Sequence, residues 1–122
     1  MSVNPHTYKG AFVFPVRVYF EDTDAGGIVY YANYLKYMER ARTELSRHAG
    51  FCHSETFNEG KGFLVVRDVN VKYLQPAYLD DLIDVHTHVT AIGKIRIEMA
   101  QVIRRGEVIL AQGHVNLVNV NQ

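Results

Sequence analysis

One stretch decides the fold of this chain: Tyr34-Leu35-Lys36-Tyr37-Met38-Glu39-Arg40-Ala41-Arg42-Thr43-Glu44-Leu45-Ser46-Arg47-His48-Ala49-Gly50. Apolar or small side chains recur in it every three or four residues, at Tyr34, Met38, Ala41, Leu45 and Ala49. That period is typical of an amphipathic helix, and the opposite face carries the charges. Because Gly50 is well placed as a C-terminal cap, we predict one helix of about four to five turns.

After this helix the apolar period changes to two, which is typical of strands. Apolar and polar side chains alternate within residues 69–73, 83–89, 95–99 and 109–117. Gly93-Lys94 and Arg105-Gly106 are spaced as hairpin turns. Before the helix, residues 12–21 are rich in Phe, Val and Tyr and predict a strand, in which Pro15 indicates an edge or an irregular start.

One strand, one helix and four further strands predict a single α+β domain over residues 1–122. The apolar stripe of the helix must cover the apolar face of a largely antiparallel sheet of about five strands. The last strands would then lie unpaired at an edge of the sheet. Since an exposed edge usually recruits a partner, we expect a homodimer or a larger homo-oligomer.

Composition argues against several classes of function, although a local basic patch that faces a phosphorylated ligand would leave no mark on the total charge. Hydrophobic residues make up 48% and charged residues 21%, as in ordinary globular proteins. Thirteen basic and thirteen acidic side chains cancel, which argues against nucleic acid as the main partner. The lone cysteine, the apparent lack of a signal peptide and the shortness of the apolar runs predict a cytoplasmic protein without membrane insertion.

An acidic loop precedes the helix: Glu21-Asp22-Thr23-Asp24-Ala25-Gly26-Gly27. The first turn of a helix offers unpaired N–H groups and a positive dipole end, which can hold a developing oxyanion. A carboxylate beside them can act as a general base on water or attack a carbonyl itself. Gly26 and Gly27 let the backbone approach a ligand without an intervening Cβ. On spacing alone, however, turn and helix capping explain these residues better than catalysis does.

A longer signature surrounds this loop. It runs Arg17-Val18-Tyr19-Phe20-Glu21-Asp22-Thr23-Asp24-Ala25-Gly26-Gly27-Ile28-Val29-Tyr30 and continues with Tyr34 and Glu39-Arg40-Ala41-Arg42-Thr43-Glu44. It resembles the 4-hydroxybenzoyl-CoA thioesterase family of hotdog-fold proteins and is similar to the branch associated with the Tol–Pal system of Gram-negative bacteria. Further similarity lies at residues 63–67 and 73–77 and at Asp80-Asp81, so that the resemblance spans about residues 14–118.

The resemblance implies a hotdog fold, in which an antiparallel sheet wraps one long helix. It implies dimers, or tetramers made of dimers, with active sites at the subunit interface. It assigns the catalytic carboxylate to Asp24 and not to Asp22, and it assigns the carbonyl-polarising backbone N–H to Tyr31. Tyr31 is the residue of the 4-hydroxybenzoyl-CoA branch, whereas the Tol–Pal-associated branch often has histidine there. A backbone donor survives that difference, and aliphatic acyl groups are favoured only modestly over aromatic ones.

Residues that would bind an acyl-CoA are harder to choose. Gly27 and Tyr30 adjoin the predicted site, and Arg67 is the least ordinary basic residue because it lies inside an apolar stretch. Packing explains most of the tyrosines near the helix start equally well. The available cations for CoA phosphates are Lys61, Arg67, Lys72, Arg96, Arg104 and Arg105.

Three other kinds of site have little support. His86 and His88 alternate with Asp84 on one face of a strand, but a metal site needs further ligands. As a thiol nucleophile, Cys52 would need a dedicated base. His53 is adjacent in sequence, but adjacency does not place the histidine where it could activate the thiol. No Gly-x-Ser-x-Gly elbow of a serine hydrolase occurs.

The sequence therefore predicts an acyl-CoA thioesterase that releases free acid and CoA from short- to medium-chain or aromatic acyl-CoA. Asp24 would be the general base or nucleophile and Tyr31 the carbonyl donor, without a metal or redox cofactor, because CoA is part of the substrate. The competing hypothesis is a non-catalytic module that binds acyl-CoA or an acyl-carrier protein. A third hypothesis, an interaction protein of the cell envelope, follows only from the Tol–Pal resemblance.

Overall fold

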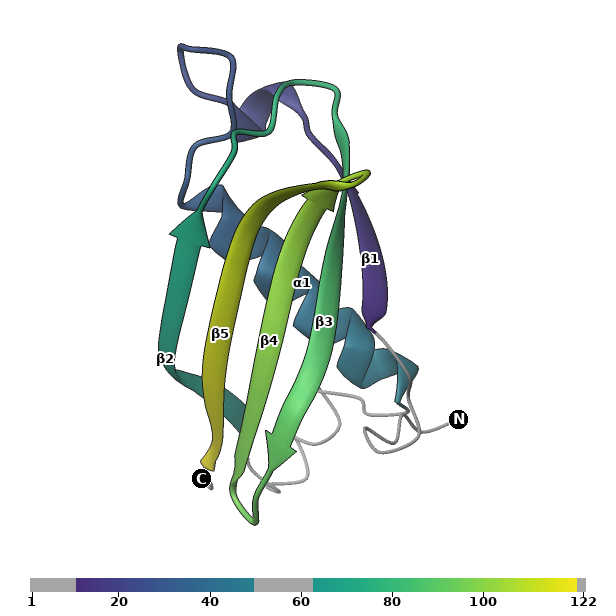
Figure 1. The fold of residues 1–122 in the computed structure, drawn as a ribbon. Helices are drawn as coiled ribbons and strands as arrows, with labels where there is room; N and C mark the ends of the chain where they lie inside the picture. The colour runs from purple at the N-terminus through teal and green to yellow at the C-terminus, as the bar shows by residue number, and fades with distance from the viewer. Residues whose placement is uncertain (1–10, 50–62, 121–122) are drawn as a thin grey trace.

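The computed structural model describes residues 11–49 and 63–120 (Figure 1). Gly50, Cys52, His53 and Lys61, each considered above, lie outside the described residues. The predicted helix is α1, Asn33–His48. Arg47 and His48 lie in its last turn, where positive charge interacts favourably with the helix dipole.

The sheet has five strands, and every neighbouring pair is antiparallel. The strands are β1 (Phe12–Arg17), β2 (Phe63–Tyr73), β3 (Leu82–Ile92), β4 (Arg96–Arg105) and β5 (Val108–Val120). Their order across the sheet is β1-β3-β4-β5-β2. Both predicted hairpin turns are confirmed, because β3 pairs with β4 and β4 pairs with β5.

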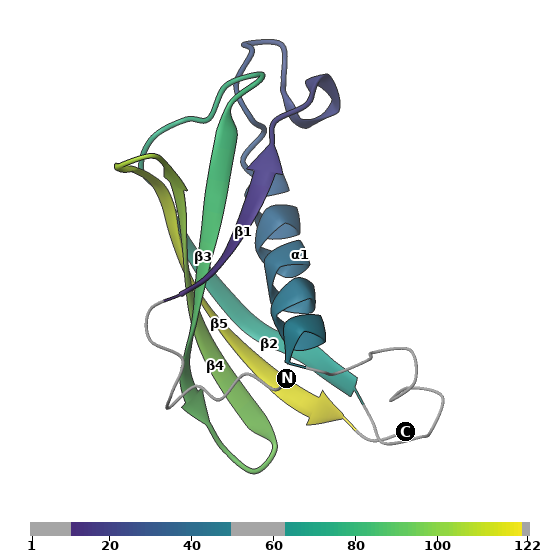
Figure 2. The ribbon, with the colours of Figure 1, turned by 90° about the vertical axis from the view of Figure 1, so that its right-hand side faces the viewer.

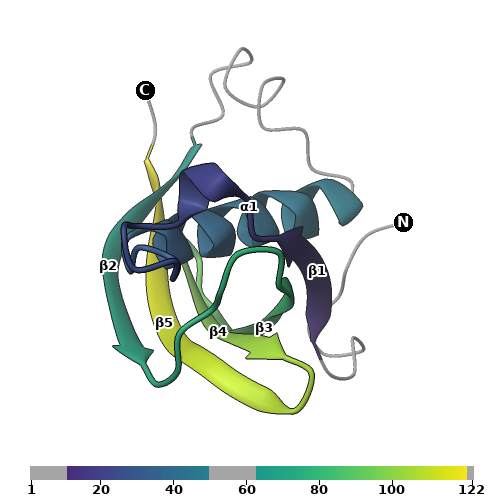
Figure 3. The same ribbon diagram turned by 90° about the horizontal axis from the view of Figure 1, so that it is seen from above.

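The helix lies against one face of the sheet, which curves around it (Figures 2 and 3). Its buried side chains are Tyr34, Met38, Ala41 and Leu45 of the predicted stripe together with Tyr37. Ala49, the fifth residue of the predicted stripe, caps the helix C-terminus and is only partly buried. Opposite them the alternation of β3 holds, since Ile83, Val85 and Thr87 are buried. Each fully buried aliphatic side chain contributes about 1.5–3 kcal/mol. This two-layer core confirms the predicted α+β hotdog architecture.

A buried polar link joins the middle of the helix to the sheet. The Gln101 side-chain amide donates to the Met38 carbonyl at 3.0 Å and to Thr87 Oγ1 at 2.9 Å. Its oxygen accepts a bond from Arg42 Nη1 at 2.9 Å. Gln101 is only 1% exposed, so these bonds satisfy an amide that would otherwise be costly to bury.

Two sequence expectations were wrong in detail. The first strand ends at Arg17, and Phe20–Asp22 form a short 3₁₀ helix, η1, where the strand was predicted to continue. The last strand is not at an edge, because β5 pairs on both sides, with β4 and β2. The edges are β1 and β2, and β1 carries Pro15 as an edge strand tolerates.

Several apolar side chains of the edge strand β2 are exposed. Val66, Val69 and Tyr73 are more than 40% exposed in this single chain. Strand β2 thus has both an unpaired edge and exposed apolar side chains. Within residues 11–49 and 63–120, no helix is long and apolar enough to cross a membrane.

Candidate active site

The acidic loop forms a tight hairpin, residues 23–29, called the acidic hairpin below. Thr23 and Val29 pair as an antiparallel bridge, and the Asp24 N–H donates to the Ile28 carbonyl at 2.9 Å. The Gly27 N–H donates back to the Asp24 carbonyl at 3.0 Å. Figure 1 shows this hairpin at the end of the molecule where α1 begins.

The hairpin needs glycine at position 26 and at position 27 for different structural reasons. Gly27 has a φ of +78°, a left-handed conformation that L side chains rarely adopt, and a Cβ there would meet no atom within 4 Å. At Gly26 a Cβ would lie 3.2 Å from Asp24 Oδ1. Gly27 therefore closes the turn, and Gly26 leaves room for the Asp24 carboxylate.

Asp24 lies exposed on this hairpin. Its Oδ1 accepts a bond from the Gly26 N–H at 2.8 Å, which fixes the direction of the carboxylate. In the part of the chain that the structure describes, its second oxygen has no protein partner. A carboxylate held by one oxygen and free at the other can accept a proton from water or attack a carbonyl.

Asp22, by contrast, is held by several hydrogen bonds. Its carboxylate accepts the Tyr19 N–H at 2.9 Å, and its carbonyl accepts both the Tyr30 N–H at 3.0 Å and the Asn33 side-chain amide at 2.8 Å. Asp22 thus ties η1 and the base of the hairpin to the first residue of α1. Sequence reasoning did not single out Asn33, whose bond to a carbonyl eleven residues earlier leaves no local pattern.

The helix start carries free backbone donors. The N–H groups of Asn33, Tyr34 and Leu35 donate to the carbonyls three residues earlier, at 2.8–3.2 Å. Over residues 11–49 and 63–120, the N–H groups of Tyr31 and Ala32 find no acceptor. The donor predicted at Tyr31 is thus uncommitted, and it lies at the positive end of the α1 dipole.

Aromatic rings surround that donor. Tyr31 packs against Tyr30 with ring centroids 4.9 Å apart and edge-on against Tyr73 of β2 at 5.7 Å. Tyr34 contacts Tyr73 at 5.5 Å, so the cluster joins the helix start to the end of the edge strand. Burial raises the pKa of the Tyr34 hydroxyl and the pKa of the Tyr73 hydroxyl above the usual value for tyrosine. These phenols therefore stay protonated near neutral pH and serve as packing and hydrogen-bonding groups.

A cavity of about 220 Å³ opens beside the cluster. Its walls are Ile28 and Val29 of the hairpin, Tyr31 and Tyr34 at the helix start, and residues 73–76. The cavity therefore lies between the hairpin, the helix start and the end of β2, and most of its lining side chains are apolar or aromatic, as is typical of small-molecule sites.

The hairpin rests on the connection between β2 and β3, residues 74–81, called the linker below. The Val29 N–H donates to the Ala77 carbonyl at 2.9 Å, and Ile28 pairs with Tyr78. The Ala77 N–H in turn donates to the Tyr34 hydroxyl at 3.0 Å. One residue, Ala77, thus contacts both the acidic hairpin and the helix, and it is completely buried.

The structure brings four of the five predicted site residues together. Asp24, Gly27, Tyr30 and Tyr31 all lie on the acidic hairpin or just before α1. Arg67 does not lie with them: it is the extra residue of a β-bulge, between Val66 and Asp68. It is six positions before Tyr73, about 20 Å along the strand. Its assignment to substrate binding stays a prediction.

Other predicted cations are scattered. Arg105 is bound to Asp81 of the linker at 2.9 Å. Arg96 is the first residue of β4 and Arg105 the last, so Arg96 lies at the opposite end of that strand, beside the turn between β3 and β4. Among the described residues, no group of three or more His, Cys, Asp or Glu side chains is arranged to hold a metal.

Comparisons with known proteins agree with this fold. The family model described as "Thioesterase superfamily" matches residues 26–112, a span that begins two residues after Asp24 and includes Tyr31. The Haemophilus influenzae protein named "Acyl-CoA thioesterase YbgC" is 41% identical over 110 residues, which are 90% of this chain and 81% of that protein.

A relative and a solved structure extend the likeness. The Escherichia coli O6:H1 protein named "Acyl-CoA thioester hydrolase YbgC" is 49% identical over 81 residues, 66% of this chain. That match covers 60% of the relative's own length. The crystal structure of a probable thioesterase from Bartonella henselae superposes with a TM-score of 0.85 at 34% identity, covering 90% of this chain and 91% of that one.

Proposed function

The chain belongs to the thioesterase superfamily, and on that premise we propose that it hydrolyses the thioester bond of acyl-CoA to free acid and CoA. The observation that carries the proposal is the uncommitted backbone N–H of Tyr31, at the start of α1, next to a hairpin whose Asp24 carboxylate has one free oxygen. A polarising donor and a carboxylate are the two groups that acyl transfer to water requires.

In this proposal the thioester carbonyl accepts a hydrogen bond from Tyr31 N–H. The developing oxyanion gains from the α1 dipole, because the positive end of the helix lies at the same place. Asp24 either takes a proton from the attacking water or attacks the carbonyl carbon and forms a mixed anhydride that water then opens. In both routes the C–S bond breaks, and the thiolate of CoA leaves and gains a proton.

Isotopic labelling separates the two routes. A single turnover in ¹⁸O-water puts label only into the acid product if Asp24 acts as a general base. A mixed anhydride can place label in the Asp24 carboxylate, which mass spectrometry of the Asp24 peptide detects. Label in that peptide rejects the general-base route.

We further propose that the working unit is a homodimer or a homotetramer. The unpaired β2 edge, the exposed Val66, Val69 and Tyr73, and the open position of Asp24 all favour a second copy that covers this side of the site. Light scattering after gel filtration tests this directly. A monomer at micromolar concentration contradicts the proposal.

Thiol release from a panel of acyl-CoAs tests the proposed activity. The panel holds short, medium and long aliphatic acyl-CoAs, an aromatic acyl-CoA and an acyl-carrier thioester, and a thiol reagent reports the product. We expect turnover of short- to medium-chain or aromatic CoA esters, in the cytoplasm where CoA esters are formed. Saturable binding without any release would instead favour a binding module, which has no need of Asp24.

A further inference from the structure

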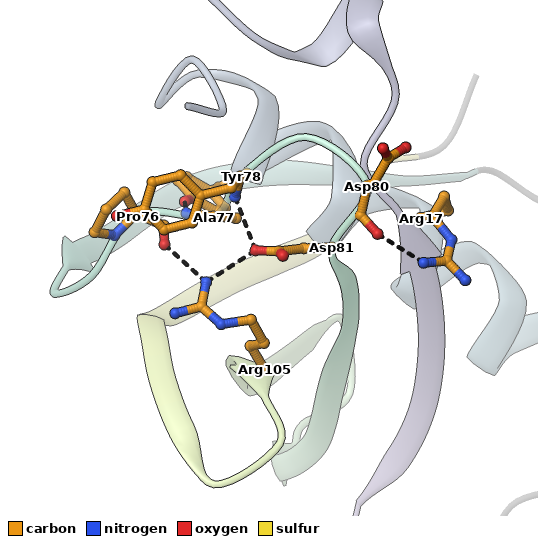
Figure 4. Close-up of polar contacts among 8 residues, drawn as sticks. Arg17, Pro76, Ala77, Tyr78, Asp80, Asp81 and Arg105 are labelled. Carbon is orange, nitrogen blue, oxygen red and sulfur yellow. Dashed lines mark hydrogen bonds and ion pairs between the residues drawn. The ribbon is translucent and has the colours of Figure 1, made fainter. Parts of the chain in front are cut away.

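The side chain of Arg105, the last residue of β4, reaches Pro76 and Asp81 of the linker (Figure 4). Its Nη1 donates to the Pro76 carbonyl at 3.0 Å and to Asp81 Oδ2 at 2.9 Å. The same Asp81 oxygen accepts the Tyr78 N–H at 2.9 Å, and the guanidinium lies 5.5 Å from the Tyr78 ring centroid. One nitrogen therefore holds both ends of residues 76–81.

This ion pair is partly shielded from water. The side chains of Arg105 and Asp81 are only 32% and 22% exposed. A charge-assisted bond in such a position is stronger and more directional than a bond between freely solvated groups. The geometry of residues 76–81 is thus set from the turn between β4 and β5.

Residues 76–81 also bond to the acidic hairpin. The residue next to Pro76 is Ala77, whose carbonyl accepts the Val29 N–H and whose N–H binds the Tyr34 hydroxyl. Tyr78 pairs with Ile28. A shift of the Pro76 carbonyl therefore moves the second arm of the hairpin and, through the chain from Val29 to Tyr31, the proposed carbonyl donor.

A second arginine provides an internal comparison. Arg17 of β1 donates from Nη1 to the Asp80 carbonyl at 2.6 Å, so it also ties the linker to the sheet (Figure 4). It holds the end next to β3, where backbone bonds between Val18 and Asp80 and between Val18 and Asp81 already fix the chain. No hairpin residue bonds to that end of the linker within the described residues.

We infer that Arg105 is a positioning residue for the reaction: through Pro76 and Ala77 it holds the acidic hairpin and the Tyr31 N–H in the geometry that hydrolysis needs. The inference rests on the proposed function. Small misplacements of reacting groups, of the order of 1 Å, can lower rates by about 10²-fold, so a contact far from the carbonyl can control the rate.

The test compares Arg105→Met with Arg105→Lys and with the matched variant Arg17→Met, each measured for kcat and KM in the thiol-release assay. We expect Arg105→Met to lower kcat at least about tenfold with KM changed less than about threefold, because transition-state alignment and not ground-state binding is lost. Arg105→Lys, which keeps a charged donor, should recover a large part of kcat. Arg17→Met should keep kcat within about twofold of the wild type.

Amide hydrogen exchange supplies a readout that does not depend on activity. The Val29 amide should exchange at least about tenfold faster in Arg105→Met, while amides of β3 and β5 keep their protection. If wild-type protein releases no thiol, the proposed function fails, and the Val29 amide still decides whether Arg105 holds the hairpin. If Arg105→Met does not fold, Asp81→Asn replaces it, since that change removes the ion pair and leaves an acceptor for the Tyr78 N–H.

An unchanged kcat in Arg105→Met overturns the inference, and so does unchanged exchange at Val29. An equal loss of kcat in Arg17→Met also overturns it, because the effect would then belong to loosening of the whole linker. A lower kcat with faster exchange at Val29, recovered by lysine, supports it.

Discussion

Asp22 and Asp24 stand two positions apart on the same loop, and their surroundings differ in almost every respect. Asp22 accepts three hydrogen bonds through its carboxylate and carbonyl, from Tyr19, Tyr30 and Asn33. The Asp24 carboxylate accepts one, from its own turn, and is otherwise open. Asp22 ties η1 and the base of the hairpin to the start of α1, whereas the Asp24 carboxylate keeps one oxygen without a partner among the described residues.

The sharpest test of this difference is Asp24→Asn. The amide keeps the size of the side chain and an oxygen for the Gly26 N–H but cannot act as a base or nucleophile. We expect kcat to fall by about 10²–10⁴-fold, the range for loss of a general base. The thermal midpoint of unfolding and the Kd for unreacted acyl-CoA should change little, as calorimetry can measure. Wild-type turnover in this variant removes Asp24 from the mechanism.

The two glycines separate turn closure from carboxylate placement. Gly27→Ala should destabilise the fold by about 1–2 kcal/mol, since the cost of a left-handed alanine is paid whatever the space around it. Gly26→Ala should leave stability closer to the wild type but lower kcat, because its Cβ crowds Asp24 Oδ1. Urea unfolding and kcat together measure both effects. Equal stability losses with equal kcat would contradict the distinction.

Asp22→Ala tests the structural half of the comparison. It removes the acceptor for the Tyr19 N–H, and loss of such a hydrogen bond costs about 0.5–1.5 kcal/mol of stability. Asp22→Asn, which keeps an acceptor oxygen, is the control and should recover most of that loss. Chemical denaturation gives both values. A variant Asp22→Ala as stable as the wild type would show that the bond contributes nothing.

The smallest expected effect concerns Tyr37, whose hydroxyl is buried near Asp22 without a hydrogen-bond partner among the described residues. Burial, and then the Asp22 charge, raises the pKa of Tyr37 above its usual value of 10.0. The folded state therefore keeps the Tyr37 hydroxyl protonated to a higher pH than the unfolded chain does. The stability that this protonated hydroxyl allows is full below about pH 10 and is lost as the pH rises above it. Tyr37→Phe should therefore lose less stability than the wild type between about pH 10 and pH 12. Identical alkaline unfolding curves would contradict this.

Much of the fold follows from local patterns. The helix stripe and the strand alternation each name a buried face, and the structure confirms the positions of Met38, Ala41, Ile83 and Val85. The order of the strands does not follow, because alternation says which face is buried and not which strand lies alongside. That is why β5 was expected at an edge and β2 was not.

The candidate site also has a part that follows from local sequence and a part that does not. Capping and catalysis both suit Asp22 and Asp24 on sequence spacing, and the resemblance to a family chose Asp24. The contacts that separate them are long-range: the Asn33 bond to Asp22, the Ala77 bond to Val29, and the reach of Arg105 to Pro76. No period or spacing in the sequence encodes such pairs, so the sequence indicates Arg105 only as one of several candidate cations for CoA.

The central claim is that catalysis depends on Asp24 and not on Asp22, and one ratio tests it most directly. The kcat for the best acyl-CoA of the panel is measured for Asp24→Asn and for Asp22→Asn in the same assay, at saturating substrate. The account predicts that Asp22→Asn keeps kcat within about tenfold of the wild type, while Asp24→Asn falls at least about 10²-fold. Equal losses in the two variants, or a larger loss in Asp22→Asn, would contradict it.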